Sequence, residues 1–576
     1  MASGRFVRLA SFIYLQFFHL LIALFFRRSS SLRDILLLLL LSYFAFGWNL
    51  GKLGLIDPDE PFYALTGRAM VQSGDWLTPQ IFGAPQFEKP IFYYWMLSGS
   101  YRIFGESEWA GRLPTALSAT ALVLLTYAFA RRVFNARAGL LAGIFMTGGL
   151  ELALMGRLML TDIPLAVFIT AALYCYWLAL EKPERRDRWI FGYMVFTGLA
   201  VLTKGPIGTL VPLFATLSFT ILGKRPWVLR GRGFWLGLAA HLAIVLPWYT
   251  LMTVEYGWKF VDEFFYRDNY LRFIRAEHPS NNHFWYYPGV LLLGSIPWLP
   301  AALLAFRRLF TGWRSTPAML FVACWFVPNL LFLTAAQSKL PSYGFYLFVP
   351  LAFLIGTALD RVLSNGFEGR GEKGMVIGAA ALQALALGGA LLVEAARPFA
   401  VPAAAFGAVL LFALAALCLG RLRLWLGATT VSTAVFIFCA MTFSFDAMEN
   451  MVSIRPIAKK MMAMQTEGEH LLAGKFGIRG VVYYTHQTVA VMSRRPHPFW
   501  ADHPVEVVVG LKGLSKLLAD HPTALCTLRK ADWNTFKKSA AFGPRNPGEW
   551  FGESLLIRAH QAALPQAASP AATTGN

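Results

Sequence analysis

Long runs of apolar residues recur along almost the whole chain, for example at residues 35–46, 234–251 and 401–419. A segment that crosses the hydrocarbon layer of a membrane needs about 20 mostly apolar residues, and its backbone groups must be hydrogen-bonded inside the segment. The runs therefore predict a polytopic α-helical membrane protein. Composition agrees, because 56% of the residues are hydrophobic and 15% are charged, whereas about a quarter of a soluble protein is charged.

About 13 transmembrane helices fit the sequence when each long run is taken as one span. We place them at residues 34–51, 112–130, 138–155, 163–180, 189–203, 206–222, 233–253, 288–305, 318–335, 343–360, 375–394, 400–419 and 425–444. Every second loop between these spans carries clustered basic residues, such as Arg131 with Arg132 and Arg185 with Arg186. By the positive-inside rule this side is cytoplasmic. In a Gram-negative cell the opposite side would be the periplasm.

The formal net charge of +20 has the same explanation. A basic protein can bind nucleic acid, but these basic residues are dispersed among the loops instead of forming one patch. We therefore expect membrane lipids, and not nucleic acid, as partners, and we expect a monomer.

Two domains are predicted. Residues 1–445 form the transmembrane domain, which includes the large outer loops 52–111 and 254–287. Residues 446–576 read as a soluble periplasmic α/β domain with a disordered tail, and we expect helices at 454–465 and 514–520 and strands at 470–473, 481–484, 489–492 and 505–509. The short apolar segment 11–26 reads as an interfacial helix or as part of the first span.

Carboxylates are the first candidates for chemistry. Asp57, Asp59 and Glu60 stand within four residues at the start of the first outer loop. Their structural alternative is a solvated turn that begins a helix. Asp162 lies between two apolar runs, where an ionisable group is costly and is a functional candidate by default. Its alternative is the cap of the next helix.

Cations on the same predicted outer side are the second group. Lys89 follows Glu88 next to an aromatic run, and Lys204 and Lys339 each interrupt apolar sequence. Their alternatives are an interfacial aromatic belt and snorkelling side chains. The loop 254–287 adds Arg267, Arg272, Arg275, His278 and His283. Cations that face one cavity would suit a phosphate group, and topology places these acids and bases on one face of the membrane.

An ordered set of short motifs resembles the GT-C glycosyltransferases that use polyprenyl-phosphate sugars. The motifs are Asp59-Glu60-Pro61-Phe62-Tyr63-Ala64, Ser73-Gly74-Asp75-Trp76, Phe87-Glu88-Lys89-Pro90, Thr203-Lys204-Gly205, Phe284-Trp285-Tyr286-Tyr287, Gly294-Ser295-Ile296-Pro297-Trp298 and Ser338-Lys339-Leu340-Pro341-Ser342-Tyr343. Within that family the pattern is most similar to the lipid A aminoarabinose transferases. One departure is that Pro61 and Phe62 replace the Thr-Arg pair of those relatives, so a cation that would contact phosphate is missing there.

The resemblance implies transfer of 4-amino-4-deoxy-L-arabinose from undecaprenyl phosphate to a phosphate group of lipid A, with inversion, at the periplasmic face of the bacterial inner membrane. This would lower the negative charge of lipid A and give resistance to polymyxin. The resemblance implies Asp59, Asp162 and Glu60 as catalytic residues. It implies as substrate-binding residues Lys89, Tyr63, Arg272, Lys204, Lys339, Tyr343 and Tyr346.

A divalent metal ion, zinc, magnesium or manganese, is a further hypothesis from the resemblance, with Glu88 and His278 as a partial site, although no tight ligand spacing supports it.

Three other functions are alternatives to aminoarabinose transfer. Another sugar, such as mannose, would be moved to protein or glycan. A transporter or flippase would show inverted repeats and midplane polar groups, which the sequence lacks. A membrane-anchored interaction protein would not explain the presence of the charged residues Asp59, Glu88, Lys89 and Asp162 at the membrane surface.

Overall fold

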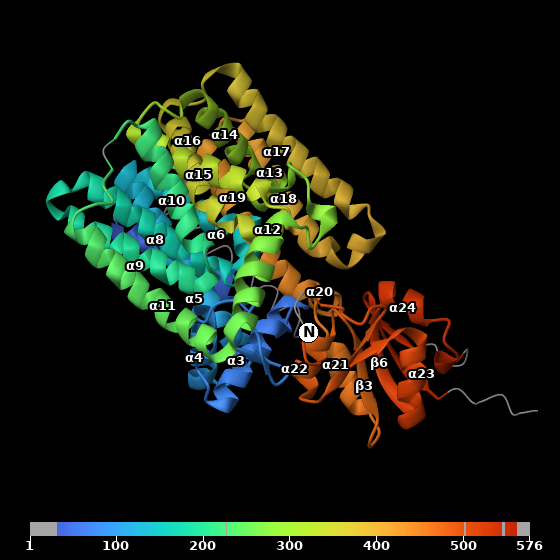
Figure 1. The fold of residues 1–576 in the computed structure, drawn as a ribbon. Coiled ribbons are helices and arrows are strands. Elements are labelled where there is room, and N and C mark those ends of the chain that lie inside the picture. Colours follow the sequence, from blue (N-terminus) through green and yellow to red (C-terminus); the bar gives the residue numbers. More distant parts are fainter. Residues whose placement is uncertain (1–30, 226, 500–502, 544–547, 562–576) are drawn as a thin grey trace, which may run out of the picture. The chain divides into compact units, whose positions relative to one another are not determined.

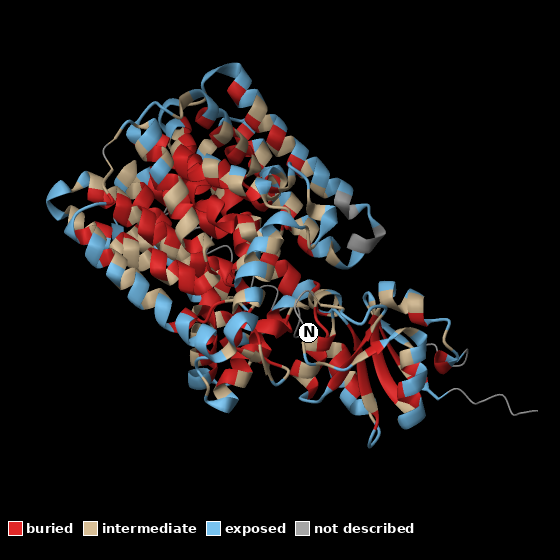
Figure 2. Ribbon diagram, viewed as in Figure 1, coloured by how far each residue is buried: buried red, intermediate tan, exposed pale blue. Residues whose placement is uncertain are grey.

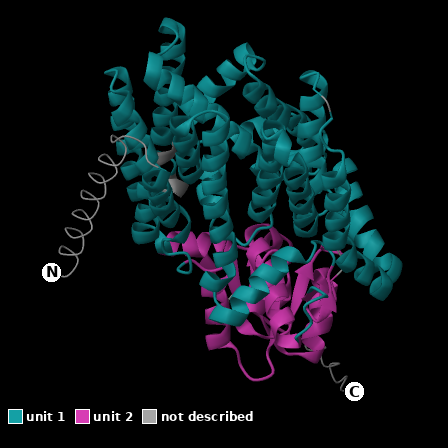
Figure 3. Ribbon diagram, turned by 90° about the vertical axis from the view of Figure 1, so that its left-hand side faces the viewer, with its two compact units in different colours: residues 1–52, 74–79, 87–445 teal, residues 53–73, 80–86, 446–576 magenta. Residues whose placement is uncertain are grey.

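The computed structural model describes residues 31–225, 227–499, 503–543 and 548–561. The segment 11–26 and the end of the chain, for which we predicted an interfacial helix and a disordered tail, lie outside these ranges. The chain divides into two compact units (Figure 3). Unit 1 comprises residues 1–52, 74–79 and 87–445, and unit 2 comprises residues 53–73, 80–86 and 446–576.

Unit 1 is helical throughout its described part (Figure 1). Its elements are α2 (Ser31–Ser42), η1 (Tyr43–Gly47), α4 (Phe92–Phe104), α5 (Glu108–Val133), α6 (Ala136–Gly148), α7 (Leu150–Met155), α8 (Asp162–Glu181), η2 (Pro183–Arg185), α9 (Arg186–Lys204), α10 (Ile207–Leu222), α11 (Arg232–Val261), η3 (Asp262–Leu271), α12 (Arg272–Ile274), η4 (Pro279–Asn281), α13 (Tyr286–Gly294), α14 (Leu299–Gly312), α15 (Pro317–Ala335), η5 (Pro341–Leu347), α16 (Phe348–Asn365), α17 (Gly369–Leu391), η6 (Glu394–Phe399), α18 (Ala400–Cys418) and α19 (Leu422–Phe443).

Among the described residues, 7 helical segments are long and apolar enough to cross a membrane. They are Glu108–Val133, Asp162–Glu181, Arg232–Ile274, Pro317–Ala335, Pro341–Asn365, Arg397–Cys418 and Leu422–Phe443. Apolar side chains on the outside of the unit agree with a lipid environment, since α11 exposes Trp235, Leu236, Leu246 and Leu251. Figure 2 shows the contrast between such outer positions and the buried inner helices. A polytopic helical membrane protein is confirmed, and the total of about 13 spans stays a prediction.

Two of the expected spans are broken helices. The expected span 138–155 contains α6 and α7, which are separated at Gly149, whose backbone is extended. The expected span 288–305 contains α13 and α14, which are separated by residues 295–298. The two breaks lie side by side, because the Leu150 backbone N–H donates to the Ile296 carbonyl over 2.8 Å. This bond satisfies backbone groups that the interrupted helices leave without partners.

Glycine residues allow α9 and α10 to approach each other closely near Lys204, the last residue of α9. Gly205 ends α9 with a positive φ of 86°, a conformation that glycine adopts without steric cost. The chain turns back into α10 at once, and an added Cβ on Gly208 would lie 2.4 Å from the Ala200 carbonyl carbon of α9. Lys204 is therefore the last residue of a helix whose end is tightly packed.

Unit 2 contains a six-stranded sheet with strand order β5-β4-β3-β6-β8-β7. Its elements are α3 (Asp59–Ser73), β1 (Gln80–Ile81), β2 (Ala84–Pro85), α20 (Phe445–Val452, whose first residue belongs to unit 1), α21 (Arg455–Met464), β3 (His470–Gly474), α22 (Ile478–Thr485), β4 (Val489–Ser493), β5 (Val507–Val509), α23 (Gly510–Asp520), β6 (Thr523–Arg529), α24 (Lys530–Phe536), η7 (Ala540–Phe542), β7 (Glu549–Phe551) and β8 (Ser554–His560).

The neighbouring strands β5, β4, β3 and β6 are parallel, and β8 and β7 complete the sheet in antiparallel pairs. Leu472 is registered with Ala490 on β4 and with Cys526 on β6. Both faces of the sheet are covered, because Leu471 packs in a cluster with Ile457 and Val481, whereas Leu472 packs in a cluster with Leu514 and Leu518. This alternation is that of a strand buried on both faces.

The strand expected at residues 481–484 is wrong, because these residues belong to α22. The β-branched pair Val481 and Val482 is typical of strands. However, β3 and β4 are parallel neighbours, and a parallel pair needs a crossover connection, which is usually a helix. Ile478, Val481 and Thr485 are buried on this helix, and their spacing is that of one helical face.

The two units divide between residues 445 and 446, where we placed the domain boundary, but part of the first outer loop, which we assigned to the transmembrane domain, belongs to unit 2. In α3, Arg68 donates to the Tyr483 carbonyl of α22 over 2.7 Å, and its guanidinium lies 4.3 Å from the centroid of the Tyr483 ring. Residues 53–73 and 80–86 are therefore part of unit 2 and do not group with the membrane helices.

Asp57 is the buried contact that ties the start of this loop into unit 2. Its Oδ2 accepts the Ile454 backbone N–H over 2.9 Å, and an added Cβ on Gly480 would lie 2.5 Å from its Oδ1. Burial raises the pKa of the Asp57 carboxyl to about 8, against the opposing effects of the Ile454 N–H and of Arg529. Glycine at position 480 thus leaves room for the carboxyl group.

We predict a pH dependence of stability that belongs to Asp57. Its ordinary pKa is 3.8, so between about pH 4 and pH 8 the unfolded chain has lost a proton that the folded chain keeps. The Asp57 contribution to stability therefore falls as the pH rises through this window and is constant above it. Thermal unfolding of the full-length protein in detergent should show a larger loss between pH 5 and pH 9 for the wild type than for Asp57→Asn.

Asp520→Asn is the matched control, because Asp520 is exposed at the end of α23 in the same unit. Its pH profile should follow that of the wild type. Identical profiles for the wild type and Asp57→Asn would contradict the assignment.

Candidate active site

A cavity of about 140 Å³ lies inside unit 1 and gathers most of the predicted site residues. It is lined by residues from the loop before α4, from α8, α9, α10, η3 and α12, and from the α15–η5 region. The polar side chains in its lining are those of Glu88, Lys89, Asp162, Lys204, Asp268, Asn269, Arg272, Ser338, Tyr343 and Tyr346. Acids and bases that are far apart in the sequence thus converge in one cavity, as their common position on the predicted outer side suggested for the residues in unit 1.

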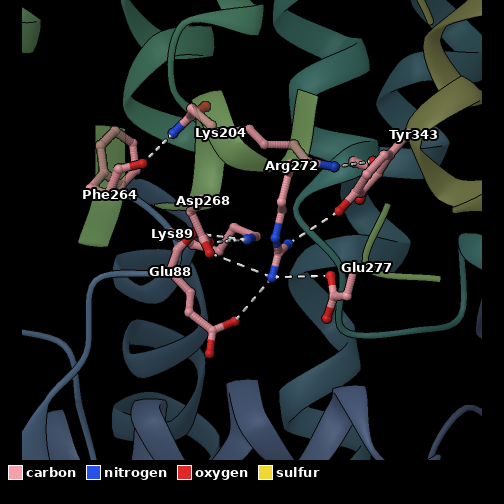
Figure 4. A network of polar contacts seen from close by, with 10 residues as sticks. Glu88, Lys89, Lys204, Phe264, Asp268, Arg272, Glu277 and Tyr343 are labelled. Carbon is pink, nitrogen blue, oxygen red and sulfur yellow. Dashed lines mark hydrogen bonds and ion pairs between the residues drawn. The ribbon is translucent and has the colours of Figure 1, made fainter. Parts of the chain in front are cut away.

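Arg272 is the centre of the polar network in this cavity (Figure 4). Its Nη1 donates to the Tyr343 hydroxyl over 3.2 Å. Its Nη2 lies 3.5 Å from Asp268 Oδ1, 3.5 Å from Glu277 Oε2 and 4.0 Å from Glu88 Oε2. Because the guanidinium is planar and offers five donors, it can contact several oxygens at once and still present an edge to an anion.

Asp268 holds two cations together. Lys89 Nζ donates to Asp268 Oδ2 over 3.3 Å and to the Glu88 carbonyl over 2.8 Å, while Arg272 pairs with Asp268 Oδ1. The Asp268 side chain is only 3% exposed. A buried carboxylate is stable as an ion only when it is paired. Asp268 therefore fixes Lys89 and Arg272 on either side of one carboxylate.

Asp162 and Lys204 form a second ion pair in the cavity. Asp162 is the first residue of α8, after the N-cap residue Thr161, and Lys204 ends α9. Lys204 Nζ also lies 4.6 Å from the centroid of the Tyr343 ring. Tyr343 therefore contacts a cation with its ring and a second cation, Arg272, with its hydroxyl group.

The structure does not place every predicted residue of unit 1 in the cavity. Lys339 is 2% exposed, and its Nζ donates to Asn282 Oδ1 over 2.7 Å and to the Ala336 carbonyl over 2.5 Å. It fastens the loop 278–287 to the turn before η5 and does not line the cavity. Tyr346 does line the cavity, from the next turn of η5.

Asp268 and Glu277 are the acids that sequence reasoning missed. The loop 254–287 was interpreted as a source of cations, and its acidic residues were passed over. The spacing of Asp268 and Arg272 held a signal, because residues four apart on a helix are neighbours. The structure shows this pair as an ion pair at that spacing.

Glu88 and His278 do not make a metal site of ordinary composition. Glu88 faces Arg272, and His278 lies before η4, outside the cavity lining. In the parts of the chain that the structure describes, no group of three or more His, Cys, Asp or Glu side chains could hold an ion. Zinc sites normally use three or four protein ligands. The donors present therefore do not fit a tightly held ion.

The remaining predicted residues, Asp59, Glu60 and Tyr63, lie in unit 2 at the start of α3. Asp59 is exposed, whereas Glu60 and Tyr63 are buried. Glu60 Oε2 accepts the Ile56 backbone N–H over 2.8 Å, so it closes the turn that leads into the helix. Within unit 2 this arrangement presents Asp59 at the surface on a well-anchored helix start.

A family model described as dolichyl-phosphate-mannose-protein mannosyltransferase matches residues 88–250 of the chain. Curated relatives carry a more specific name. An undecaprenyl phosphate-α-4-amino-4-deoxy-L-arabinose arabinosyl transferase of Pseudomonas fluorescens is 32% identical over 359 residues, which are 60% of this chain and 59% of the relative. A transferase of the same name from Aeromonas salmonicida is 32% identical over 54% of this chain and 58% of the relative. The chain thus spans less than two thirds of these relatives.

Solved structures extend the likeness to nearly the whole chain. The crystal structure of ArnT from Cupriavidus metallidurans bound to undecaprenyl phosphate superposes with a TM-score of 0.72 at 21% identity, and covers 93% of this chain and 100% of that protein. The same protein in its apo state gives a TM-score of 0.71. The resemblance that the ordered motifs predicted is therefore confirmed, by sequence to aminoarabinosyl transferases and by fold to a solved ArnT.

Proposed function

We propose that the chain transfers 4-amino-4-deoxy-L-arabinose from undecaprenyl phosphate to a phosphate group of lipid A. The observation that carries this proposal is the unit 1 cavity, in which Lys89, Lys204 and Arg272 meet beside Asp162. The named activity of the relatives supports the choice of sugar and lipid carrier. Each addition would place a cationic sugar on lipid A, lower its negative charge and so weaken the binding of polymyxin.

Lys89 and Arg272, with the Tyr343 hydroxyl, would bind the phosphate of the donor. Both cations are already in place because Asp268 holds them. A preorganised pair of donors stabilises the negative charge that develops on the leaving undecaprenyl phosphate, without further rearrangement during the reaction. Arginine can also grip a phosphate with two parallel hydrogen bonds.

Asp162 would stabilise the positive charge that develops on the sugar ring as the bond to the leaving phosphate breaks. Lys204 keeps Asp162 in place through their ion pair. The acceptor phosphate is already anionic near neutral pH, so alignment of acceptor and donor is the main remaining task. The family resemblance is the ground for a role of Asp59, with Glu60 and Tyr63, in orienting the acceptor or binding the sugar. Attack from the opposite face of the sugar would invert the anomeric carbon.

The site would face the periplasm at the inner membrane. The alternation of basic loops along the sequence supports this orientation. About 13 spans would then place the two ends of the chain on opposite sides, with the α/β part of unit 2 in the periplasm and the protein acting as a monomer.

Mass spectrometry of lipid A tests the proposal. Cells that make the aminoarabinose donor and lack other transferases should gain an aminopentose adduct on lipid A when the wild-type chain is expressed. Asp162→Asn should abolish the adduct, because it removes the charge that would stabilise the sugar cation, while the protein is still found in the membrane.

Asp360→Asn is the matched control, because Asp360 on α16 pairs with Arg137 outside the cavity. This variant should give the wild-type level of adduct. Unmodified lipid A with the wild-type chain would overturn the proposal. It would then favour transfer of another sugar, such as the mannose named in the family description, to protein or glycan.

A metal requirement is tested by chelation. Glu88 and His278 are the predicted ligands, and Glu88 is paired with Arg272, so we expect at most weak binding of zinc, magnesium or manganese. Purified protein should hold less than one equivalent of metal after dialysis against a chelator, and transfer should continue. Activity that is lost on chelation and restored by one of these ions would contradict this expectation.

A further inference from the structure

Several buried side-chain oxygen atoms in the described part of unit 1 have no hydrogen-bond partner, and four of them belong to residues near the candidate active site. These four are the Glu151 Oε1 atom and the hydroxyl oxygens of Thr161, Tyr287 and Tyr346. Their residues are between 0% and 9% exposed. Buried polar groups are almost always hydrogen-bonded, so a cluster of four such atoms indicates a place where a polar ligand completes the structure.

The four residues come from elements that pack together. Glu151 is on α7, Thr161 directly precedes Asp162, Tyr287 is on α13 and Tyr346 is on η5. The helix α7 packs against α13 and η5, and α13 packs against η5. An added Cβ on Gly294 at the end of α13 would lie 2.7 Å from the Glu151 Cβ. Glu151 is therefore enclosed at the junction of these elements.

Two of the residues connect this cluster to the candidate active site. The Tyr346 side chain lines the active-site cavity, although its hydroxyl is one of the unpartnered groups. Glu151 lies close enough to Asp162 for the two carboxyl groups to interact electrostatically. The cluster thus borders the acid that is assigned to the reacting sugar.

Glu151 differs from the acids that line the cavity. Glu88 and Asp268 pair with Arg272, and Asp162 pairs with Lys204. Among the described residues, no cation lies within ion-pair distance of Glu151. Burial of an acid without a partner is unfavourable. The buried Glu151 side chain is not needed to hold α7 in place, because the backbone hydrogen bond from Leu150 to Ile296 joins α7 to the break between α13 and α14.

We propose that Glu151, with the hydroxyl groups of Thr161, Tyr287 and Tyr346, forms the subsite that receives the ammonium group of the transferred sugar. This inference rests on the proposed transfer of an aminosugar. The ammonium group supplies the cation that Glu151 lacks, and the sugar hydroxyl groups satisfy the orphaned oxygens. The acid makes the site selective, because a neutral sugar of the same shape would leave Glu151 unpaired.

Competition between two donors tests the proposal. Purified protein is given undecaprenyl phosphate that carries either the aminosugar or the same sugar with a hydroxyl in place of the amino group, and kcat/KM is measured for each. The wild type should prefer the aminosugar donor by about ten-fold or more. In Glu151→Gln and Glu151→Met the preference should fall to near one, mainly through loss of activity with the aminosugar, whereas Glu151→Asp should retain most of it.

Glu181→Gln is the matched control. Glu181 ends the helix that Asp162 begins, and it forms an exposed pair with Arg132, so this variant should keep the wild-type preference. A preference that is unchanged in the neutral Glu151 variants, or loss of folded protein in both, would overturn the subsite. Failure of the wild type to use the aminosugar donor at all would instead overturn the proposed function, and the subsite with it.

Discussion

The ion pairs of Asp268 with Lys89 and Arg272 are the interaction on which the candidate site depends. They lie inside a helical unit whose outer surface is apolar, where an unpaired charge is costly. Asp268 is nearly fully buried and joins two cations that come from different loops. Without this carboxylate the two cations would repel each other, and Arg272, around which Glu88, Glu277 and Tyr343 gather, would lose its link to Lys89. A phosphate that enters the cavity meets cations that the protein has already placed.

Much of the architecture and most of the polar residues that line the cavity could be predicted from the sequence. Apolar runs of membrane-spanning length specify helices because lipid offers the backbone no other partners. Asp162 and Lys204 stood out because charges in apolar surroundings are rare, whereas Lys89 and Arg272 were selected as cations on the predicted outer side that would suit a phosphate. Asp268 was hidden in a polar loop, where an acid needs no explanation. Glu151 was hidden inside an expected span, although the Gly148-Gly149 pair between α6 and α7 is a local signal of a break.

Unit 2 shows a different limit of sequence reasoning. The strands β3 and β4 were predicted because each is a short apolar run. The helix α22 was mistaken for a strand, since its β-branched residues carry no information about the crossover that two parallel strands require. The joining of residues 53–73 to this unit depends on Arg68 and on the buried carboxyl of Asp57. These contacts join residues 397 and 415 positions apart, so they are set by tertiary packing and have no local sequence pattern.

A structure of the protein with undecaprenyl phosphate, by cryo-electron microscopy in lipid nanodiscs, tests the central claim most directly. The account predicts the phosphate group within hydrogen-bonding distance of both Lys89 Nζ and the Arg272 guanidinium, with Asp268 still in contact with at least one of them. Phosphate density elsewhere, with the pairs of Asp268 unchanged and the cavity empty, would contradict it.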